Sequence, residues 1–475
     1  MKKIRLSIIV SFLLLLPLST LQAQKWLDMW KRDQGYSFFE IQKEANEYFA
    51  AHGTERGAGY KQFKRWEYYM EPRAGKDGMI MNPQTKVFNN YMEFLQAKSF
   101  ADATQKTVSV NGDWTFFGSE NYFKGTDGYS GGVGRINVVA FHPTNANIIY
   151  VGAPAGGLWR TTNAGGTWTP LTDGIAFWGV SGIVVHPTNP NIIYILTGDG
   201  DGSSSRSAGV WKSTNGGATW SPTGFSFSSA NSSQVGYKLL IDPSNSNVLY
   251  VVMSNGLRKT TNGGSSWTTV KSGNFRDMEF KPGASSTIYL TGGNAIHRST
   301  NSGSSWTQVH TVSGASRLAL AVSPANSNYV YALAGGAAPA GSYKGLFRST
   351  NSGVTWTTRS TTPNILGHET NGSGNSNQGW YDLSLAVSPT NINRLHSGGV
   401  NVWTSTNGGS SFSIQSYWVE NTVGYQYTHA DIHDLVYRGN TLYCGSDGGI
   451  FRTTNSGSNW NDISAGLAIT EFYRF

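Results

Sequence analysis

Short apolar runs separated by turn residues fill most of the chain after residue 130. They come in pairs, as in INVVAFHP (136–143), which ends at a proline, and NIIYVG (147–152), which is rich in Ile, Val and Tyr. A third run, such as GLWRTT (157–162), leads into a polar turn, and a fourth leaves it. Apolar runs with many β-branched and aromatic residues, bounded by Pro, Gly and Asn, indicate strands rather than helices. The pattern therefore predicts an all-β region built from groups of four antiparallel strands.

The polar turn recurs seven times with nearly the same residues. The copies are TTNAGGTW (161–168), STNGGATW (213–220), TTNGGSSW (260–267), STNSGSSW (299–306), STNSGVTW (349–356), STNGGSSF (405–412) and TTNSGSNW (453–460). Their asparagines are 52, 47, 39, 50, 56 and 48 residues apart. Repeats of about this length that each carry four strands predict the blades of a multi-bladed β-propeller.

Each residue of the turn has a structural use. The Asn side chain accepts hydrogen bonds from nearby backbone N–H groups, as in an Asx turn. The Gly two residues later supplies a positive φ, and the aromatic residue three further on is expected to cover the hairpin and pack inward on the blade. We therefore expect the turns to build the fold and to carry no chemistry.

The two ends of the repeat region carry incomplete blades. VNGDWTFFG (110–118) has the pattern of a fourth strand without the first three, and ITEFYRF (469–475) that of a first strand without the rest. Propellers often close by sharing one blade between the chain ends, because closure removes exposed strand edges. We expect residues 107–475 to form seven full blades plus a split blade, at least eight in the intact ring, and thus a C-terminally incomplete fragment. In the alternative, a complete chain would pair 469–475 beside 110–118 in a seven-bladed ring.

Residues 1–23 have the pattern of a cleaved signal peptide. Lys2, Lys3 and Arg5 precede an apolar core, and LQAQ offers a cleavage site after Ala23. A membrane anchor is the alternative, although the apolar run is short for a span. The pattern predicts export through the periplasm to a secreted or cell-surface location, with no membrane span in the mature chain.

Residues 24–106 differ from the repeats. Acidic and basic residues alternate there, and FFEIQKEANEYFAAHG (38–53) and YKQFKRWEYYME (60–71) have apolar residues at helical spacing. Gly53 is expected to end the first helix, and Pro72 the second. These features predict a small N-terminal helical segment, with a pro-segment removed after export as the alternative.

The amino-acid composition narrows the classes of protein to which the chain can belong. Charged residues are only 13% of the chain, Gly is abundant at 58, and the net charge of +8 falls to +5 when the three positive charges of residues 1–23 are removed. No Lys/Arg cluster with interleaved aromatic residues points to nucleic acid. Cys444 is the single cysteine, so no intramolecular disulfide forms, and its apolar run predicts a buried position.

The first strands of a propeller line its central channel, and their N-terminal ends surround one mouth. The polar residues entering these strands are Arg135, Lys238, Arg276, Asp277, Arg317, Asp382, His429, Asp431 and His433. In HADIHD (429–434), alternation places His429, Asp431 and His433 on one side of a strand. His and carboxylate groups suit a divalent metal, a polar ligand or a buried hydrogen-bonded network, and all three remain open.

Two acidic loops add candidates. SDGG (446–449) places Asp447 between the second and third strands of the last blade. Glycosidases use two carboxylates about 5–10 Å apart, and Asp447 with Asp431 or Asp382 is the candidate pair. GDGDG (198–202) resembles a calcium loop only weakly, and we expect a solvated loop there.

The turn resembles the Asp-box, or BNR repeat, of sialidases, sortilin-type propellers and some β-glucanases. Its usual acidic residue is Asn in all seven copies, which leaves the fold unaffected and counts against calcium in the turns. In xyloglucanases the loop after the second strand resembles TDxGGxY and its Asp is catalytic. Blade one here has GAPAGG with Pro154 near that position, so that Asp is missing. A FRIP-like sialidase motif is also absent from the sequence.

A second resemblance covers residues 36–475. GYKQFKRWEYYMEPR (59–73), GRINVVAFHPTNANIIYVGAPAGGLWRTTNAGGTW (134–168), NQGWYDLSLAVSPTN (377–391) and HADIHDLVYRGNTLYCGSDGGIFRTTN (429–455) are similar to large secreted Bacteroidota proteins. Those proteins carry a sortilin-like propeller and a distant C-terminal sorting domain. The resemblance implies type IX secretion cargo, with the secretion machinery as a partner through a C-terminal domain that this sequence does not contain.

These observations support two main hypotheses. The first is a secreted or cell-surface propeller that binds an extracellular protein or polysaccharide, with Arg135, His429 and His433 as ligand-binding residues. The alternative is a glycoside hydrolase, xyloglucanase- or sialidase-like, with Asp431, Asp447 and Asp382 as catalytic carboxylates. A propeller that serves only as an adhesin spacer is a third possibility. No cofactor is predicted, and the metal question stays open.

Overall fold

The computed structural model divides into two compact units, residues 1–86 and 87–475. It describes residues 25–31, 36–55, 59–79, 93, 131–175, 179–202, 205, 207–226, 234–338, 341–374 and 377–469. The predicted signal peptide (1–23), the predicted strand 110–118 and all but the first residue of 469–475 lie outside these ranges.

The N-terminal unit is helical, as predicted. It contains α2 (Lys25–Lys31), α3 (Phe38–His52), α4 (Tyr60–Met70) and the short 3₁₀ helix η1 (Glu71–Arg73). Ser37 and Glu40 form a capping box at the start of α3, and Gly53 ends it with a φ of 82°. The core is mostly aromatic and includes Trp26, Phe38, Phe49, Phe63 and Trp66. Among the helices that the structure describes, none is both long and apolar enough to cross a bilayer.

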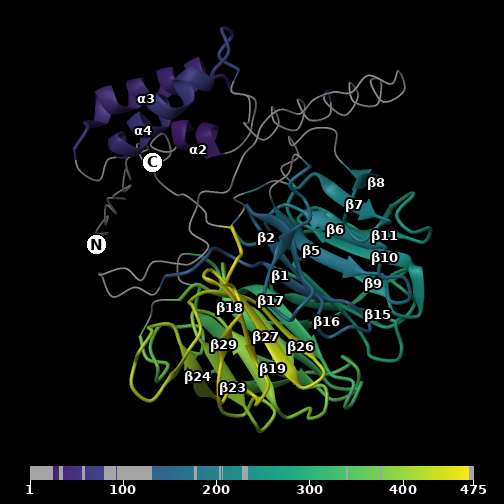
Figure 1. Cartoon of the computed structure of the whole chain (residues 1–475). Helices are drawn as coiled ribbons and strands as arrows, with labels where there is room; N and C mark the ends of the chain where they lie inside the picture. Colours follow the sequence, from purple (N-terminus) through teal and green to yellow (C-terminus); the bar gives the residue numbers. More distant parts are fainter. Residues whose placement is uncertain are drawn as a thin grey trace, which may run out of the picture. The chain divides into compact units, whose positions relative to one another are not determined.

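The second unit is a β-propeller, as predicted, with seven sheets that we number blades 1–7 in chain order (Figure 1). Each blade is antiparallel and its strands neighbour one another in sequence order; blade 6 adds β25, which runs parallel to β24. Blade 1 consists of β1 (Val138–Phe141), β2 (Ile149–Ala153), β3 (Gly157–Thr161) and β4 (Thr169–Pro170). Blade 2 consists of β5 (Val180–Val185), β6 (Ile193–Thr197), β7 (Gly209–Ser213) and β8 (Ser221–Ser226). Blade 3 consists of β9 (Gly236–Asp242), β10 (Asn245–Met253), β11 (Gly256–Thr260) and β12 (Thr268–Lys271).

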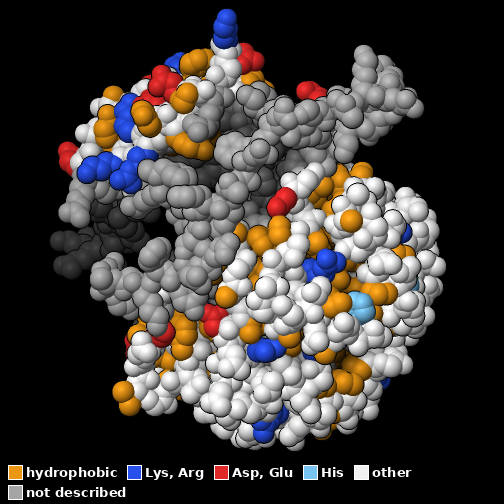
Figure 2. Space-filling model, viewed as in Figure 1, with side chains coloured by type: hydrophobic (Ala, Val, Ile, Leu, Met, Phe, Trp, Pro, Cys, Tyr) orange, Lys and Arg blue, Asp and Glu red, His pale blue; other side chains and the backbone are white. Residues whose placement is uncertain are grey.

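Blade 4 consists of β13 (Asp277–Phe280), β14 (Ile288–Gly292), β15 (Ala295–Ser299) and β16 (Thr307–Thr311). Blade 5 consists of β17 (Ala315–Val322), β18 (Val330–Gly336), β19 (Tyr343–Ser349) and β20 (Thr357–Ser360). Blade 6 consists of β21 (Ser384–Val387), β22 (Leu395–Gly398), β23 (Val402–Ser405), β24 (Ser413–Tyr417) and β25 (Gln426–Tyr427). Blade 7 consists of β26 (Ile432–Arg438), β27 (Thr441–Ser446), β28 (Gly449–Thr453) and β29 (Asn461–Asp462). Charged side chains are few and scattered on the propeller surface in view in Figure 2.

The ring closes between blade 7 and blade 1. The first strands β1, β5, β9, β13, β17, β21 and β26 contact one another in that order, and β26 contacts β1. Trp168 of blade 1 donates a hydrogen bond to the Ile463 carbonyl at 2.8 Å. Ile469 is buried in the same apolar seam. The described residues therefore form a seven-bladed ring, and the expected eighth blade is not shown. The apolar faces of blades 1 and 7 cover each other.

Each turn has the predicted Asx geometry. The asparagine Oδ1 accepts the backbone N–H four residues later, at 2.8 Å for Asn301 and Ser305. The Ser or Thr two residues before the asparagine accepts the N–H of the turn glycine, as Ser299 does from Gly303 at 2.9 Å. Gly303 has a φ of 82°, and Ser302 before it has a φ of 54°. Two successive left-handed residues explain why small residues precede the glycine in every copy.

The turn aromatics are less buried than we expected. Trp168 is 8% exposed, but its six counterparts are half-buried on the blade edges. In blades 3–5 the indole N–H donates to the turn's own glycine carbonyl, at 3.0 Å for Trp306 and Gly303. These side chains thus cover the hairpin without entering the blade core, because the sheet ends at the outer strand beside them.

Every turn also links its blade to the preceding one. The carbonyl of the residue after the asparagine accepts a hydrogen bond from a side chain of the neighbouring blade. The pairs are Arg160–Gly216, Lys212–Gly263, Lys259–Ser302, Arg298–Ser352, Arg359–Gly408, Gln415–Ser456 and Arg452–Ala164. The last pair joins blade 7 to blade 1 by the same rule, which supports closure at seven blades.

Candidate functional site

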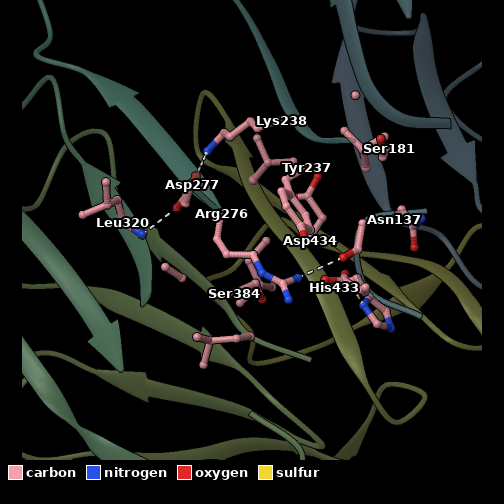
Figure 3. Close-up of a pocket in the computed structure, with 18 of the residues that line it drawn as sticks. Asn137, Ser181, Tyr237, Lys238, Arg276, Asp277, Leu320, Ser384, His433 and Asp434 are labelled. Carbon is pink, nitrogen blue, oxygen red and sulfur yellow. Dashed lines mark hydrogen bonds and ion pairs between the residues drawn. The ribbon is translucent and has the colours of Figure 1, made fainter. Parts of the chain in front are cut away.

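The first strands of all seven blades line a central cavity of about 400 Å³ (Figure 3). The side chains facing it are aliphatic along the walls and charged at two levels. The lining residues with titratable side chains are Asp201, Tyr237, Lys238, Arg276, Asp277, Glu279, Arg317, His433 and Asp434. Pockets that combine apolar walls with a few polar groups are the usual form of small-molecule sites.

The first level is a network at the mouth, where the first strands begin. Arg135 pairs with Asp199 at 2.9 Å, and Arg317 pairs with Asp201 at 2.7 Å. The His433 ring lies between two carboxylates, with Nδ1 2.7 Å from Asp201 and Nε2 2.8 Å from Asp447. Residues from blades 1, 2, 5 and 7 thus meet in one charged network.

Asp447 is the carboxylate of this network nearest to solvent. The Tyr381 hydroxyl donates to its two oxygens at 3.0 and 2.9 Å, and the Arg135 Nε lies 3.8 Å from Oδ1. The Tyr381 ring stands edge-on to the His433 ring, with 4.8 Å between centroids. The Asp447 side chain is nevertheless 26% exposed. Asp447 can therefore contact a ligand while its position is held by three neighbours.

The electrostatics fix the charge states of this network. Burial opposes protonation of His433, but its hydrogen bonds to Asp201 and Asp447 outweigh this and raise its pKa to about 10. Burial also disfavours the charged forms of the two carboxylates. Arg317 and His433 nevertheless hold the Asp201 pKa well below its ordinary range, and His433 lowers the Asp447 pKa. At neutral pH the cluster is an imidazolium between two carboxylates.

Two further carboxyl groups at the mouth have raised pKa values, in contrast to Asp201 and Asp447. Gln378 donates to Asp431 at 2.7 Å, and burial followed by the charge of Asp447 raises the Asp431 pKa. Asp382 is fully buried, and neither of its oxygens has a hydrogen-bond partner among the residues that the structure describes. Burial and then Asp431 raise the Asp382 pKa well above its ordinary value. Carboxyl groups with raised and with lowered pKa values therefore stand side by side at this mouth.

The structure brings most of the predicted site residues together, but not for the predicted reason. Arg135, His433 and Asp447 share one network, and Asp431 and Asp382 adjoin it. The strand-face argument for HADIHD is wrong, because β26 begins only at Ile432 and Asp431 has a φ of 62°. His429 lies outside the strand, where its Nδ1 is 3.2 Å from the Ala430 carbonyl and its ring packs against Gly448.

Sequence reasoning missed several members of the site. The GDGDG loop was expected to be solvated, yet Asp199 is fully buried and Asp201 is 12% exposed, because both pair with cations of other blades. Tyr381 and Gln378 were not selected either. A comparison of equivalent loops would have found Asp201, since it follows the second strand of blade 2 as Asp447 follows that of blade 7.

The second level lies deeper in the channel. Lys238 contacts both Asp277 and Glu279 at 2.6 Å, and Asp434 accepts the Val139 N–H at 2.8 Å. Burial raises the pKa of Asp434 to about 6 and also raises that of Glu279. Burial disfavours the charged form of Lys238, but Asp277 and Glu279 reverse this and raise its pKa above the ordinary value. This level carries three carboxyl groups for one ammonium.

Within the described ranges, no three His, Cys, Asp or Glu side chains are arranged to hold a metal ion. The carboxylates of Asp201 and Asp447 and both His433 ring nitrogens are instead used in contacts within the protein. The arrangement is that of an ion-pair network with partly exposed acceptors.

Comparison with known proteins places the fold. Residues 156–294 match the family described as "Sortilin, neurotensin receptor 3" (Sortilin-Vps10). A xyloglucanase of Hypocrea jecorina (strain QM6a) is 32% identical over 136 residues, which is 26% of this chain and 16% of that enzyme. The chain therefore spans a small part of this relative.

Solved structures of GH74 enzymes share the fold over most of the propeller. The GH74 xyloglucanase from Xanthomonas campestris is 18% identical with a TM-score of 0.53, covering 71% of this chain and 55% of its own. The Niastella koreensis GH74 enzyme is 23% identical with a TM-score of 0.52 and the same coverage, 71% and 55%. The chain thus spans about half the length of these enzymes. The protein is a β-propeller that resembles theirs, with a partial match to the sortilin type.

Proposed function

We propose that the protein is a secreted or cell-surface β-propeller that binds a glycan at the mouth of its channel. One observation carries the proposal. Trp380 is 39% exposed and its ring packs against the Tyr381 ring, and the Tyr381 hydroxyl donates to the partly exposed carboxylate of Asp447. An aromatic face and hydrogen-bond acceptors joined in one corner are the combination with which proteins bind ligands that have both apolar faces and hydroxyl groups.

The chemistry of this corner suits a sugar. The Trp380 ring offers an apolar face, and its ring centroid lies 5.7 Å from that of Tyr381. Asp447 offers carboxylate oxygens that accept hydrogen bonds from hydroxyl groups. Arg317 donates to the Trp380 and Tyr381 carbonyls at 3.2 and 2.6 Å, so this loop is held in place before a ligand arrives. An extracellular protein is the other ligand class, and the partial match to a xyloglucanase favours polysaccharide.

A glycoside hydrolase is the second candidate, and one observation favours it. The pKa of Asp431 is raised and that of Asp447 is lowered, although both lie at the same mouth. Such a separation is the pattern of an acid and a base in glycosidases. Binding remains the better-supported function, because Asp447 and Asp431 are both committed to hydrogen bonds with neighbours and Asp382 is closed off from solvent.

The test measures binding and hydrolysis in parallel. The mature chain is titrated with xyloglucan, cellulose, xylan and pectin oligosaccharides, and reducing ends are assayed after long incubation. Trp380→Ala and Asp447→Asn are compared with Tyr68→Ala, which removes an 83% exposed aromatic ring from the helical unit.

Binding that Trp380→Ala weakens by about tenfold or more, with no reducing ends released, supports the binding function. Hydrolysis that Asp447→Asn or Asp431→Asn abolishes, with the fold intact, supports the enzyme. If no glycan binds, or if Tyr68→Ala weakens binding equally, the mouth is not a glycan site.

The location is proposed from residues 1–23. Export predicts that protein recovered from the culture medium or the cell surface begins at Gln24, after cleavage behind Ala23. Retention of residues 1–23 on protein in the membrane fraction would favour an anchor instead.

A further inference from the structure

The cations around the channel mouth pair off with carboxylates, and one cation is left over. Arg135 pairs with Asp199, Arg317 with Asp201, and His433 with Asp201 and Asp447. Among the charged groups that line the cavity within the described ranges, Arg276 is the cation without a carboxylate in ion-pair contact. Its Nη1 donates to the Gly200 carbonyl at 3.1 Å, and its guanidinium lies 4.3 Å from the centre of the Tyr237 ring.

Arg276 is placed to meet a ligand. It immediately precedes β13, and Figure 3 shows its side chain reaching toward the middle of the cavity, near Tyr237, Ser384 and His433. Burial and the neighbouring charge of Arg317 lower its pKa, yet a guanidinium stays protonated at any physiological pH. The charge of Asp201 acts on Arg276 without a direct ion pair, so this partly buried charge is not fully compensated, and an anion in contact with it would stabilise it further.

The donors beside this charge suit a carboxylate. A guanidinium presents five N–H donors in a planar fork, and Arg276 uses one of them on Gly200. The Tyr237 hydroxyl has no hydrogen-bond partner within the described ranges, and burial raises its pKa, so it remains a neutral donor. A planar fork with an adjacent hydroxyl matches the two oxygens of a carboxylate.

The deeper level of the cavity limits how far an anion can enter. Asp277, Glu279 and Asp434 surround the single ammonium of Lys238 there. Their negative charge repels an anion, so a carboxylate is stable only at the level of Arg276. The cavity of about 400 Å³ has room for one sugar residue and lies in the lower part of the usual range for small-molecule sites.

We propose that the glycan recognised by this propeller is acidic, and that a uronic-acid residue enters the channel mouth with its carboxylate on Arg276 and Tyr237. This inference rests on the proposed function and names the class of ligand for the same mouth. Trp380 and Asp447 then contact the neighbouring sugar residues, whereas Arg276 selects the acidic one.

The experiment titrates the full mature chain with a galacturonic acid trimer, its carboxyl-reduced galactose counterpart, and a sulfated galactose trimer. Arg276→Gln is compared with Arg258→Gln. Arg258 is a matched control, because it also lies over an aromatic ring, 4.6 Å from Phe225, and hydrogen-bonds to Asn255, but it is on β11 and does not line the cavity. Circular dichroism melting checks the fold of each variant.

The wild type is expected to bind the galacturonic acid trimer about tenfold or more tightly than the reduced trimer, as a partly buried ion pair implies. Arg276→Gln removes that preference, whereas Arg258→Gln keeps it. Arg276→Lys retains the charge but not the fork, so it keeps part of the preference and provides a second readout if Arg276→Gln fails to fold.

Three results would overturn the inference. Equal binding of the acidic and reduced trimers leaves the glycan-binding function standing and removes the acidic preference. A preference for the sulfated trimer that Arg276→Gln abolishes assigns a sulfate site instead of a carboxylate site. Failure of all glycans to bind, here and in the broader titration above, removes the proposed function together with this inference.

Discussion

The two faces of the propeller follow opposite rules. On the face that carries the asparagine turns, seven blades repeat one set of hydrogen bonds with the same residue types. On the opposite face, around the channel mouth, the blades contribute different residues: Arg135 from blade 1, Asp201 from blade 2, Arg276 from blade 4, Arg317 from blade 5, and His433 and Asp447 from blade 7. Antiparallel strands place the two sets at opposite ends of each blade.

The difference between the two faces indicates which residues build the fold and which are available for a specific site. A feature that every blade shares must satisfy a need that every blade has, and each turn both closes its hairpin and accepts a side chain from the blade before it. A residue that appears at an equivalent position in one blade alone does not serve a structural need common to all blades. The loop after the second strand holds Asp447 in blade 7, Asp201 in blade 2 and Pro154 in blade 1. In a repeat protein, departures from the repeat at equivalent positions indicate where the specific site lies.

The largest effect is expected at the mouth. His433→Ala removes a fully buried imidazolium and leaves two carboxylates facing an empty space, so we expect a loss of about 3–5 kcal/mol in the free energy of unfolding. Urea denaturation followed by circular dichroism measures it. His297→Ala on β15 is the control, since His297 has no carboxylate partner among the described residues, and its loss is expected to be about 1 kcal/mol or less. Equal losses in the two variants would mean that the mouth network adds nothing specific to stability.

The pH dependence of stability follows from the same network. The His433 pKa is raised to about 10 in the folded chain, against about 6.5 in the unfolded chain. Its contribution is therefore fully present below pH 6.5 and is lost as the pH rises toward 10. We expect the stability of the wild type to fall across this range more steeply than that of His433→Gln. Parallel curves for the two proteins would show that the imidazolium is not held by Asp201 and Asp447.

Two turn tryptophans on the same face differ in burial and in hydrogen bonding. Trp168 is 8% exposed and donates to Ile463 across the blade 7–blade 1 seam, whereas Trp306 is half-buried and bonds only within its own turn. Trp168→Ala is expected to cost about 3–5 kcal/mol, and Trp306→Ala about 2 kcal/mol because less area is buried. Thermal denaturation of the two variants tests this order. A reversed order would contradict the direct closure of blade 7 on blade 1.

The smallest effects concern the turn asparagines. Asn301→Ala removes the acceptor for the Ser305 N–H and is expected to cost about 1 kcal/mol. Asn301→Asp restores that acceptor and is expected to stay within about 0.5 kcal/mol of wild type. Neither variant should change glycan binding, and a binding defect in Asn301→Ala would assign a function to the turn face.

The sequence allowed the blades and turns to be predicted because their causes are local. The spacing of strands, the asparagine acceptor and the left-handed glycine all lie within about 50 residues of one another. The mouth network depends on distant pairs instead: His433 and Asp201 are 232 residues apart, and Arg135 and Asp199 are 64 apart. No local pattern reports such pairs, so the GDGDG loop was misinterpreted as solvated.

Two other expectations assumed regularity. Alternation in HADIHD assumed a strand, whereas the backbone turns at Asp431 and only His433 enters β26. The expected eighth blade assumed that partial strands at the two ends complete a sheet. Ile469 instead packs into the seam between blades 7 and 1, where the two apolar faces already meet. Burial at this seam depends on three-dimensional packing, which the strand pattern alone does not encode.

Hydrogen–deuterium exchange with and without the galacturonic acid trimer reports on both faces of the propeller in one measurement. We predict slower exchange in the mouth peptides that contain residues 377–383, residues 429–449, Tyr237 or Arg276, and unchanged exchange in the seven asparagine turns. Protection confined to the turns, or spread equally over both faces, would contradict the claim that the repeated face builds the fold and the irregular face binds the ligand.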